Sequence, residues 1–189
     1  AIGILIGIIR TIPIDQNTRL PARIVFETVN SLLLCYIEVF RGTPMIVQAM
    51  VVFYGAAMLY NIHLSPIPAG IFIVSINTGA YMAEIVRGGI LSVDKGQFEA
   101  AHSIGMTHAQ TMANIVLPQA VRNILPATSN EFVINIKDTS VLSVISVTEL
   151  FFMSKSVAGI NYRYFEVFLI TCIIYFIMTF TVTRILRYL

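Results

Sequence analysis

The most informative stretch of the sequence is Asp94–Pro118, which reads DKGQFEAAHSIGMTHAQTMANIVLP. It is a soluble-looking segment between long apolar runs. Asp94 is followed three residues later by Gln97, and Thr107 is followed at the same distance by Gln110. Both pairs are capping-box patterns, in which the first side chain accepts from backbone N–H groups at a helix start. The stretch is therefore predicted to form two short helices, the second starting near residue 108.

The segment between the two predicted helices contains Gly105. A helix end often needs a residue that tolerates positive φ, and glycine does so without steric cost. Ala100 and Ala101 would let another surface approach the first helix closely. A hairpin of this size buries little apolar surface on its own, so we expect it to bind a partner.

The same stretch resembles the EAA signature of bacterial ATP-binding-cassette (ABC) importer permeases. The signature positions are matched by Glu99, Ala100, Ala101, Gly105, Ile115, Leu117 and Pro118. In that family the hairpin is the cytoplasmic coupling helix, which docks on a separate ATPase subunit. The resemblance therefore implies an ATPase-docking surface made by Glu99, Ala100, Ala101 and Gly105.

Two other interpretations of the hairpin are a DNA-binding helix–turn–helix and a structural cap without a docking partner. A DNA-binding element should be distinctly basic. In this stretch, however, Lys95 is the only residue with a permanent positive charge, and Asp94 and Glu99 are both negative. The charge balance argues against a nucleic-acid partner. The structural cap stays open as the alternative.

The composition predicts an integral membrane protein. Hydrophobic residues make up 57% of the 189 residues and charged residues 12%, and the mean hydropathy is +0.81. These values lie far from the soluble average, and the apolar runs approach the roughly 20 residues that cross a bilayer. Cys35 and Cys172 lie in or beside apolar runs, so we expect free thiols without a metal or redox role.

The apolar runs predict an all-α membrane domain over residues 1–189, with five transmembrane helices and a cytoplasmic coupling hairpin. We interpret the first run as the end of a helix whose beginning lies before residue 1. A mixed segment at 24–40 carries Glu27, Asn30 and Glu38, which favours an amphipathic or protein-buried helix on the cytoplasmic side. The predicted spans are 1–12, 43–60, 67–88, 119–147 and 164–186, with the hairpin at 94–118.

The start of the second span carries further information. Thr43 suits the N-cap and Pro44 the first turn of a helix. The run RGTPMIVQ, from Arg41 to Gln48, resembles the polar-amino-acid branch of ABC permeases. Lys and Arg gather on the hairpin side of the predicted spans, so the positive-inside rule places the hairpin in the cytoplasm and the turn at 61–66 outside.

Polar residues at membrane depth are candidates for the substrate path, because such side chains usually face a cavity or pair within the bundle. Glu131, Asn135 and Asp138 share one helical face, and Thr139 and Ser140 follow directly. They would meet the ammonium and carboxylate groups of an amino acid. The alternative is a buried polar network that locks helices together, and Lys137 fits either interpretation.

The third predicted span offers a second polar stripe. Asn77, Tyr81 and Glu84 recur at spacings of four and three residues. We assign Asn77 and Tyr81 to the substrate path. For Glu84 and Arg87 we favour an i,i+3 ion pair at the cytoplasmic end of the helix.

No catalytic or phosphate-binding motif occurs in the sequence. It contains no G-x-x-x-x-G-K-[ST] loop, and His63, His102 and His108 lack metal-ligand spacing. We therefore expect a non-enzymatic transport subunit of the bacterial cytoplasmic (inner) membrane, with ATP and Mg held by a partner ATPase.

The family likeness implies three further partners: a second copy or homologous permease, an extracytoplasmic amino-acid-binding protein or fused binding domain, and membrane lipid. Two alternatives to an ATP-driven permease remain. An ion-coupled secondary transporter would ordinarily show inverted repeats, of which the sequence gives no sign. A membrane-embedded enzyme would need a catalytic constellation.

Overall fold

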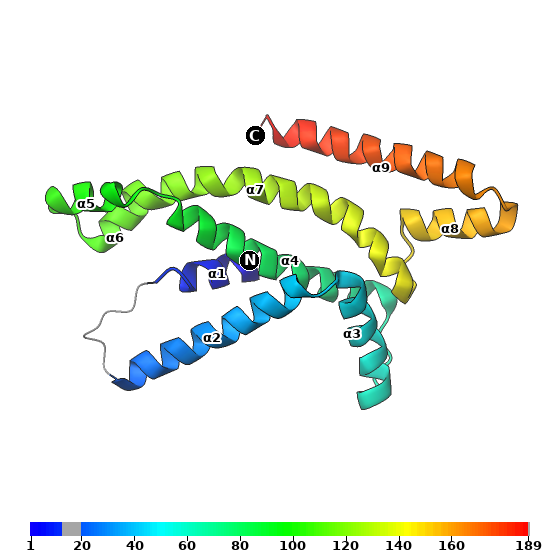
Figure 1. The fold of residues 1–189 in the computed structure, drawn as a ribbon, viewed down its shortest axis with the longest axis horizontal. Helices are drawn as coiled ribbons and strands as arrows, with labels where there is room; N and C mark the ends of the chain where they lie inside the picture. The colour runs from blue at the N-terminus through cyan, green and yellow to red at the C-terminus, as the bar shows by residue number, and fades with distance from the viewer. Residues whose placement is uncertain (13–19, 189) are drawn as a thin grey trace. The chain divides into compact units, whose positions relative to one another are not determined.

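The computed structural model describes residues 1–12 and 20–188, and over these residues it is entirely helical (Figure 1). The first half of the chain contains α1 (Ile2–Ile9), α2 (Leu20–Gly42), α3 (Met45–Tyr60) and α4 (Pro66–Leu91). The short helices α5 (Lys95–Ser103) and α6 (His108–Thr111) follow. The remainder contains the π-helical turn Met112–Val116, α7 (Leu117–Asp138), the 3₁₀ segment Thr139–Ile145, α8 (Leu150–Asn161) and α9 (Tyr164–Leu186).

The described chain forms two compact units, and each is treated by itself. The first unit contains Ala1–Arg41 and Thr78–Thr128, and the second contains Gly42–Asn77 and Ser129–Leu189. Helices α4 and α7 each contribute residues to both units. The hairpin predicted from the sequence lies wholly in the first unit.

In the first unit, α1 packs against α4 at very short range. A Cβ placed on Gly3 would lie 2.5 Å from the carbonyl oxygen of Gly79, and one on Gly7 would lie 2.7 Å from that of Ala83. Side chains larger than glycine cannot occupy these positions unless the helices move apart. The spacing of the two glycines on α1 therefore serves close helix contact.

Two apolar clusters complete the first unit. The cluster beneath α1 consists of Ile6, Ile37, Ala80 and Ala83. The other cluster joins the C-terminal part of α4 to the start of α7 and takes in Phe98 of α5 and Met112 beside the hairpin. Its buried members are Val86, Ile90, Val93, Val116 and Ala120.

In the second unit, α3 and the N-terminal part of α4 pack against the 3₁₀ segment. The buried residues of this cluster are Ala49, Ala69, Ile73, Leu142 and Ile145. Helix α8 packs against α9, where the Thr171 hydroxyl donates to Ser154 Oγ at 2.6 Å. Both of these hydroxyls are buried.

The π-helical turn before α7 has a local cause. Pro118 has no N–H to donate, and in a regular α-helix its ring would press on the carbonyl of Asn114. The chain widens instead, so that the Leu117 N–H reaches the carbonyl of Met112 five residues back. The Gln119 side chain donates to the carbonyl oxygen of Ile115 at 2.9 Å. A side chain thus satisfies a backbone acceptor beside the proline.

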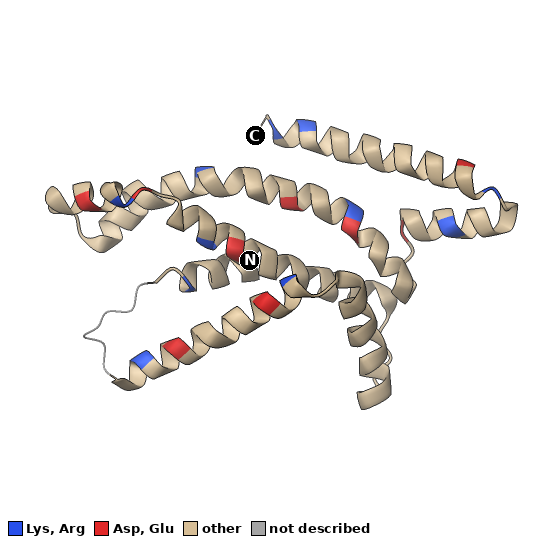
Figure 2. Cartoon of the chain, viewed as in Figure 1, with Lys and Arg blue, Asp and Glu red and all other residues tan. Residues whose placement is uncertain are grey.

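Within residues 1–12 and 20–188, three helices are long and apolar enough to cross a membrane: α2, α4 and α9. The segment His108–Ile145 together with α8 passes the same test as a pair bent by 55°, which would make a fourth, broken span. Figure 2 shows how sparse charges are on these helices; on α9 they lie near its two ends. The protein is a multi-pass, all-α membrane protein.

The helix bounds can be compared with the predicted spans, whose crossing of the membrane stays a prediction. The span predicted at 164–186 coincides with α9, and the one at 67–88 lies within α4. The span predicted at 43–60 is α3, whose 16 residues reach about 24 Å against a hydrocarbon core of about 30 Å. The span predicted at 119–147 is not a single straight helix, because α7 gives way to the 3₁₀ segment.

In the N-terminal region, helix α2 covers the mixed segment at 24–40. By its length and composition, helix α2 could cross a membrane despite its charged residues. Arg23 and Glu27 pair with each other at 2.8 Å across one turn, which reduces their cost. The count of five spans, with 1–12 as the end of the first, stays a prediction. The polar connection predicted around residues 13–19 lies outside the described residues.

The α1–α4 contact makes a prediction about stability. Gly7→Ala should lower the midpoint of thermal unfolding of the purified protein, because its Cβ meets the α4 backbone and overpacking costs about 1–3 kcal/mol. Gly88→Ala, on α4, is the control. Nothing lies within 4 Å of a Cβ at that position, and alanine is favoured over glycine in a helix by about 1 kcal/mol.

A Gly7→Ala protein that unfolds at or above the wild-type temperature would show that α1 does not pack on α4 at this distance. Equal losses in the two variants would point to a general intolerance of alanine and would contradict the argument in the same way.

Candidate functional site

The hairpin begins at a capped helix. The Asp94 carboxylate accepts from the backbone N–H of Gly96 at 2.6 Å and so satisfies one of the open donors at the start of α5. Asp94 is therefore an N-cap, as predicted. The reciprocal contact from Gln97 is absent from the part of the chain that the structure describes, so the first capping box is incomplete.

The turn after α5 is a Schellman motif. Gly105 has φ +82°, a conformation that L side chains resist. Its N–H donates to the carbonyl of His102 at 2.9 Å, and the N–H of Met106 donates to the carbonyl of Ala101 at 3.1 Å. These are the two hydrogen bonds that define this helix end. The prediction for Gly105 is confirmed.

The second helix begins with a complete capping box. The Thr107 hydroxyl accepts from the N–H of Gln110 at 3.3 Å, and the Gln110 side chain accepts from the N–H of Thr107 at 2.9 Å. Helix α6 starts at His108, as the sequence predicted. The caps and the glycine turn together fix the shape of the hairpin with local interactions.

The hairpin presents part of its surface to solvent. Glu99, Ala100 and Gly105 are exposed, whereas Ala101 is buried against the rest of the first unit. Ile104, at the turn, is 78% exposed, which is a high value for an apolar side chain. Of the four residues predicted to dock an ATPase, three are thus accessible and Ala101 supports the helix from behind.

The polar residues predicted to line a path lie in different surroundings. Asn77 is buried and donates to the Gln48 side-chain oxygen at 3.0 Å. Gln48 in turn donates to both the carbonyl and the hydroxyl of Thr43, at 2.9 and 2.8 Å. Asn77 is therefore part of a buried polar chain that ties α4 to the start of α3. A glutamine inside an apolar run was the one sign of this pairing in the sequence.

This chain of contacts corrects one detail of the sequence analysis. The residue that caps α3 is Pro44, in extended conformation with ψ 135°, and no side chain caps the helix. Thr43 was predicted to be the cap. The Thr43 hydroxyl instead accepts a hydrogen bond from the Gln48 side chain. Thr43 lies one residue before the observed cap, Pro44, and so outside the first turn of α3.

Helix α7 places its polar residues at different depths. Glu131 is buried, with 9% of its surface exposed, and the Asn135 side chain donates to the Glu131 carbonyl at 3.0 Å. Lys137 and Asp138 are exposed in the isolated chain. Asp138 ends the α-helix, and Thr139 begins the 3₁₀ segment with its hydroxyl bonded to the Ile136 carbonyl at 3.0 Å.

The burial and contacts of these residues do not test whether they line a substrate path, so the path stays a prediction. Glu131, Asn135, Asp138, Thr139 and Ser140 lie in sequence along the end of α7 and the start of the 3₁₀ segment, within the second unit. Asn77 belongs to the same unit. Tyr81 belongs to the first unit, where the Arg41 guanidinium carbon lies 5.4 Å from the centre of its ring.

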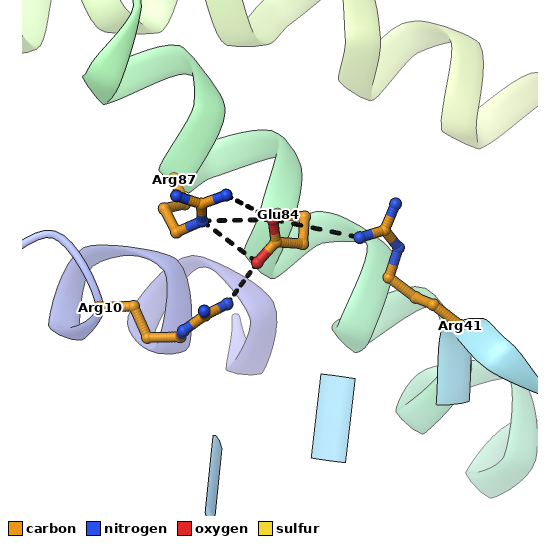
Figure 3. A network of polar contacts seen from close by, with 4 residues as sticks. All are labelled: Arg10, Arg41, Glu84 and Arg87. Atoms are coloured by element: carbon orange, nitrogen blue, oxygen red, sulfur yellow. Dashed lines mark hydrogen bonds and ion pairs between the residues drawn. The ribbon is translucent and has the colours of Figure 1, made fainter. Parts of the chain in front are cut away.

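Glu84 is the centre of an ion cluster in the first unit (Figure 3). Arg87 contacts it at 2.9 Å, the predicted i,i+3 pair. Arg10, at the end of α1, also donates to Glu84. Arg41, in the last turn of α2, lies 4.0 Å from the other carboxylate oxygen. Because Arg10 and Arg41 come from distant parts of the chain, helix periodicity gave no signal for them.

Glu149 is a carboxylate that the sequence analysis did not single out. It caps α8 by accepting from the N–H groups of Phe151 and Phe152 at 2.7 and 2.6 Å. The Tyr175 hydroxyl of α9 donates to it at 3.0 Å. Three donors on one carboxylate explain how it lies in a largely apolar unit, and they fix α8 against α9. In the described parts of the chain, no group of three His, Cys, Asp or Glu could hold a metal ion.

Comparison with known proteins decides the family. The family model described as "Binding-protein-dependent transport system inner membrane component" matches residues 18–189. The chain belongs to this family. It is accordingly an ABC transporter permease, and the family consists of inner membrane components of transport systems.

Curated relatives point in the same direction. The chain is 38% identical over 159 residues to the glutamine transport system permease protein GlnP of Escherichia coli, covering 84% of this chain and 73% of the relative. It is 38% identical over 179 residues to the L-cystine transport system permease protein TcyB of Bacillus subtilis, covering 94% and 73%. The nopaline transport system permease protein NocM of Agrobacterium fabrum is 36% identical, covering 97% and 78%.

Solved structures agree with the fold. A structure described as an amino acid ABC transporter with histidines superposes with a TM-score of 0.84 at 38% identity, covering 99% of this chain and 83% of the other. An inward-facing conformation of the MetNI methionine ABC transporter has a TM-score of 0.69 at 18% identity, covering 99% and 85%. The second likeness concerns the fold alone.

Proposed function

We propose that this permease forms half of the path by which a polar amino acid enters a bacterial cell, driven by a separate cytosolic ATPase. The other half would be a second copy or a homologous permease. An extracytoplasmic binding protein, or a fused binding domain, would deliver the substrate. The observation that carries this proposal is the exposed, capped hairpin at Glu99–Gly105, which has the EAA pattern.

The geometry of the hairpin suits force transmission to a partner. Two N-caps and a Schellman turn hold it, so a partner that pushes on α5 moves a defined body rather than a loop. Its base joins the apolar cluster of α4 and α7 through Phe98 and Met112. Motion of the hairpin would thus reach two long helices directly. The sequence has no phosphate-binding loop of its own, so ATP and Mg belong to the partner.

The substrate class rests on the relatives. Two of the three described above are named for glutamine and L-cystine, and the structural neighbour at 38% identity is described as an amino acid transporter. An amino acid carries an ammonium and a carboxylate, and both must exchange their hydration for fixed polar groups when they cross an apolar layer.

The end of α7 offers such groups. Buried Glu131 can meet an ammonium group, and Asn135 can meet either end of an amino acid. The 3₁₀ segment that follows has its own hydroxyls at Thr139 and Ser140. In the second unit Asn77 is oriented by Gln48, which favours a fixed contact over a mobile one. We assign the path to these residues together with Asp138.

The docking proposal predicts the behaviour of hairpin variants. Gly105→Val should cost about 1 kcal/mol or more, because a β-branched residue resists positive φ, and Glu99→Lys reverses a charge on the exposed face. Both should reduce co-purification with the ATPase and amino-acid uptake, while the protein stays in the membrane. Gly105→Asn is the matched control, since asparagine tolerates this conformation.

Normal complex formation and uptake in both Gly105→Val and Glu99→Lys would overturn the docking role. Uptake that persists without any ATPase would favour an ion-coupled transporter instead.

The path proposal predicts a substrate effect at Glu131. Glu131→Gln should raise the amino-acid concentration needed to stimulate ATP hydrolysis in the assembled complex, because loss of a charged partner costs about 1–3 kcal/mol, or roughly 5- to 150-fold. Glu166→Gln is the control, since Glu166 is exposed at the start of α9 and pairs with Arg163. The affinity of the binding protein itself should not change.

A Glu131→Gln complex that assembles and responds to substrate like the Glu166→Gln control would show that Glu131 is structural packing. Selectivity would then reside in the binding protein alone.

A further inference from the structure

The ion cluster around Glu84 has more positive than negative charge. Three arginines, Arg10, Arg41 and Arg87, surround a single carboxylate. Across residues 1–12 and 20–188, these arginines form ion pairs with no other acidic side chain. The cluster therefore keeps a formal surplus of two positive charges.

A comparison of hydrogen-bond donors with acceptors also indicates that the cluster lacks negatively charged partners. Each guanidinium has five N–H donors in a fixed fork, whereas a carboxylate offers about four acceptor sites. Glu84 cannot satisfy three guanidiniums. The Nε of Arg10 is buried and lacks a hydrogen-bond partner within the described chain. Because an unsatisfied buried donor is costly, the cluster is suited to a second anion.

The cluster is open on one side. The side chain of Arg10 is 12% exposed, that of Arg87 34% and that of Arg41 44%. Arg41 reaches Glu84 only at 4.0 Å, and the Tyr81 ring holds its guanidinium by a cation–π contact. Arg41 is thus held beside the cluster by Tyr81, while it makes no short contact with Glu84. Figure 3 shows Arg41 on the opposite side of Glu84 from Arg10.

The positions of the three arginines along their helices indicate which kind of anion lies near the cluster. Arg10 follows the last residue of α1, Arg41 lies in the last turn of α2, and Arg87 lies one turn before the end of α4. Helix α4 is long and apolar enough to cross the membrane. The ends of such helices lie at the level of the lipid headgroups, where phosphates are abundant.

We propose that Arg41 and Arg87, supported by Arg10, bind the phosphate of an anionic membrane lipid. Guanidinium groups bind phosphate oxygens in pairs of parallel hydrogen bonds, which suits arginine better than lysine. Glu84 holds the three side chains together and, as the single countercharge, limits the strength of the site. The inference concerns the lipid as a ligand and does not depend on which substrate the permease carries.

The test is a binding titration of the purified full-length protein in detergent with dioctanoyl phosphatidylglycerol. Arg41→Gln should weaken binding about fivefold, the effect of one basic residue near an anionic lipid surface. Arg163→Gln is the matched control, because Arg163 is 73% exposed and lies 3.5 Å from Glu166. It should bind the lipid like the wild type, and dioctanoyl phosphatidylcholine should bind none of the proteins measurably.

Two further variants separate ligand binding from folding. Glu84→Gln removes the countercharge and should strengthen lipid binding, a direction that loss of folding cannot produce. Arg41→Lys keeps the charge without the paired donors and should fall between wild type and Arg41→Gln, which keeps the test decisive if Glu84→Gln does not fold.

Three results would overturn the inference. Arg41→Gln could bind the lipid as tightly as the wild type, or Arg163→Gln could lose as much affinity as Arg41→Gln, which would indicate a general basic surface. Inorganic phosphate that displaces the lipid at equal concentration would assign the site to a free anion rather than to lipid.

Discussion

Every polar group that this chain takes out of water has to find a partner within the chain, because lipid offers none. Two irregular points of the backbone meet this constraint locally. The π-helical turn beside Pro118 is completed by the Gln119 side chain, and the Glu149 carboxylate serves the first N–H groups of α8. In the second unit, buried Asn77 donates to Gln48, which in turn donates to Thr43. The breaks that a transport path needs are thereby compatible with a stable helical protein.

The same constraint distinguishes the hairpin from the membrane helices. Its caps and its Schellman turn use only neighbouring residues, so it keeps its shape without being covered, and it exposes Glu99, Ala100 and Ile104. A defined surface of this kind can transmit a push from a partner into α4 and α7, with which it shares a core. In the Glu84 cluster the constraint is met in part, since one carboxylate serves three guanidiniums.

The sequence predicted what depends on near neighbours. The Asp94 N-cap, the capping box of Thr107 and Gln110, the positive φ of Gly105 and the Glu84–Arg87 pair all follow from spacings within a few residues, and the structure confirms them. It did not predict contacts between distant segments, such as Arg10 with Glu84 or Gln48 with Asn77, because periodicity has no information on which helices meet. The span predicted at 119–147 contains the 3₁₀ segment Thr139–Ile145, for which periodicity gave no signal. The docking and substrate roles stay predictions.

The central claim is that the Glu99–Gly105 surface contacts a separate ATPase during transport. Cross-linking in intact membranes tests it most directly, using a single cysteine at Ala100 in a protein whose Cys35 and Cys172 are replaced by serine. A short bifunctional thiol reagent should join this cysteine to the ATPase subunit, with a yield that changes when ATP is added. A cysteine at Asn61, in the turn between α3 and α4, should give no such product. Absence of a cross-link at Ala100, or an equal yield at Asn61, would contradict the account.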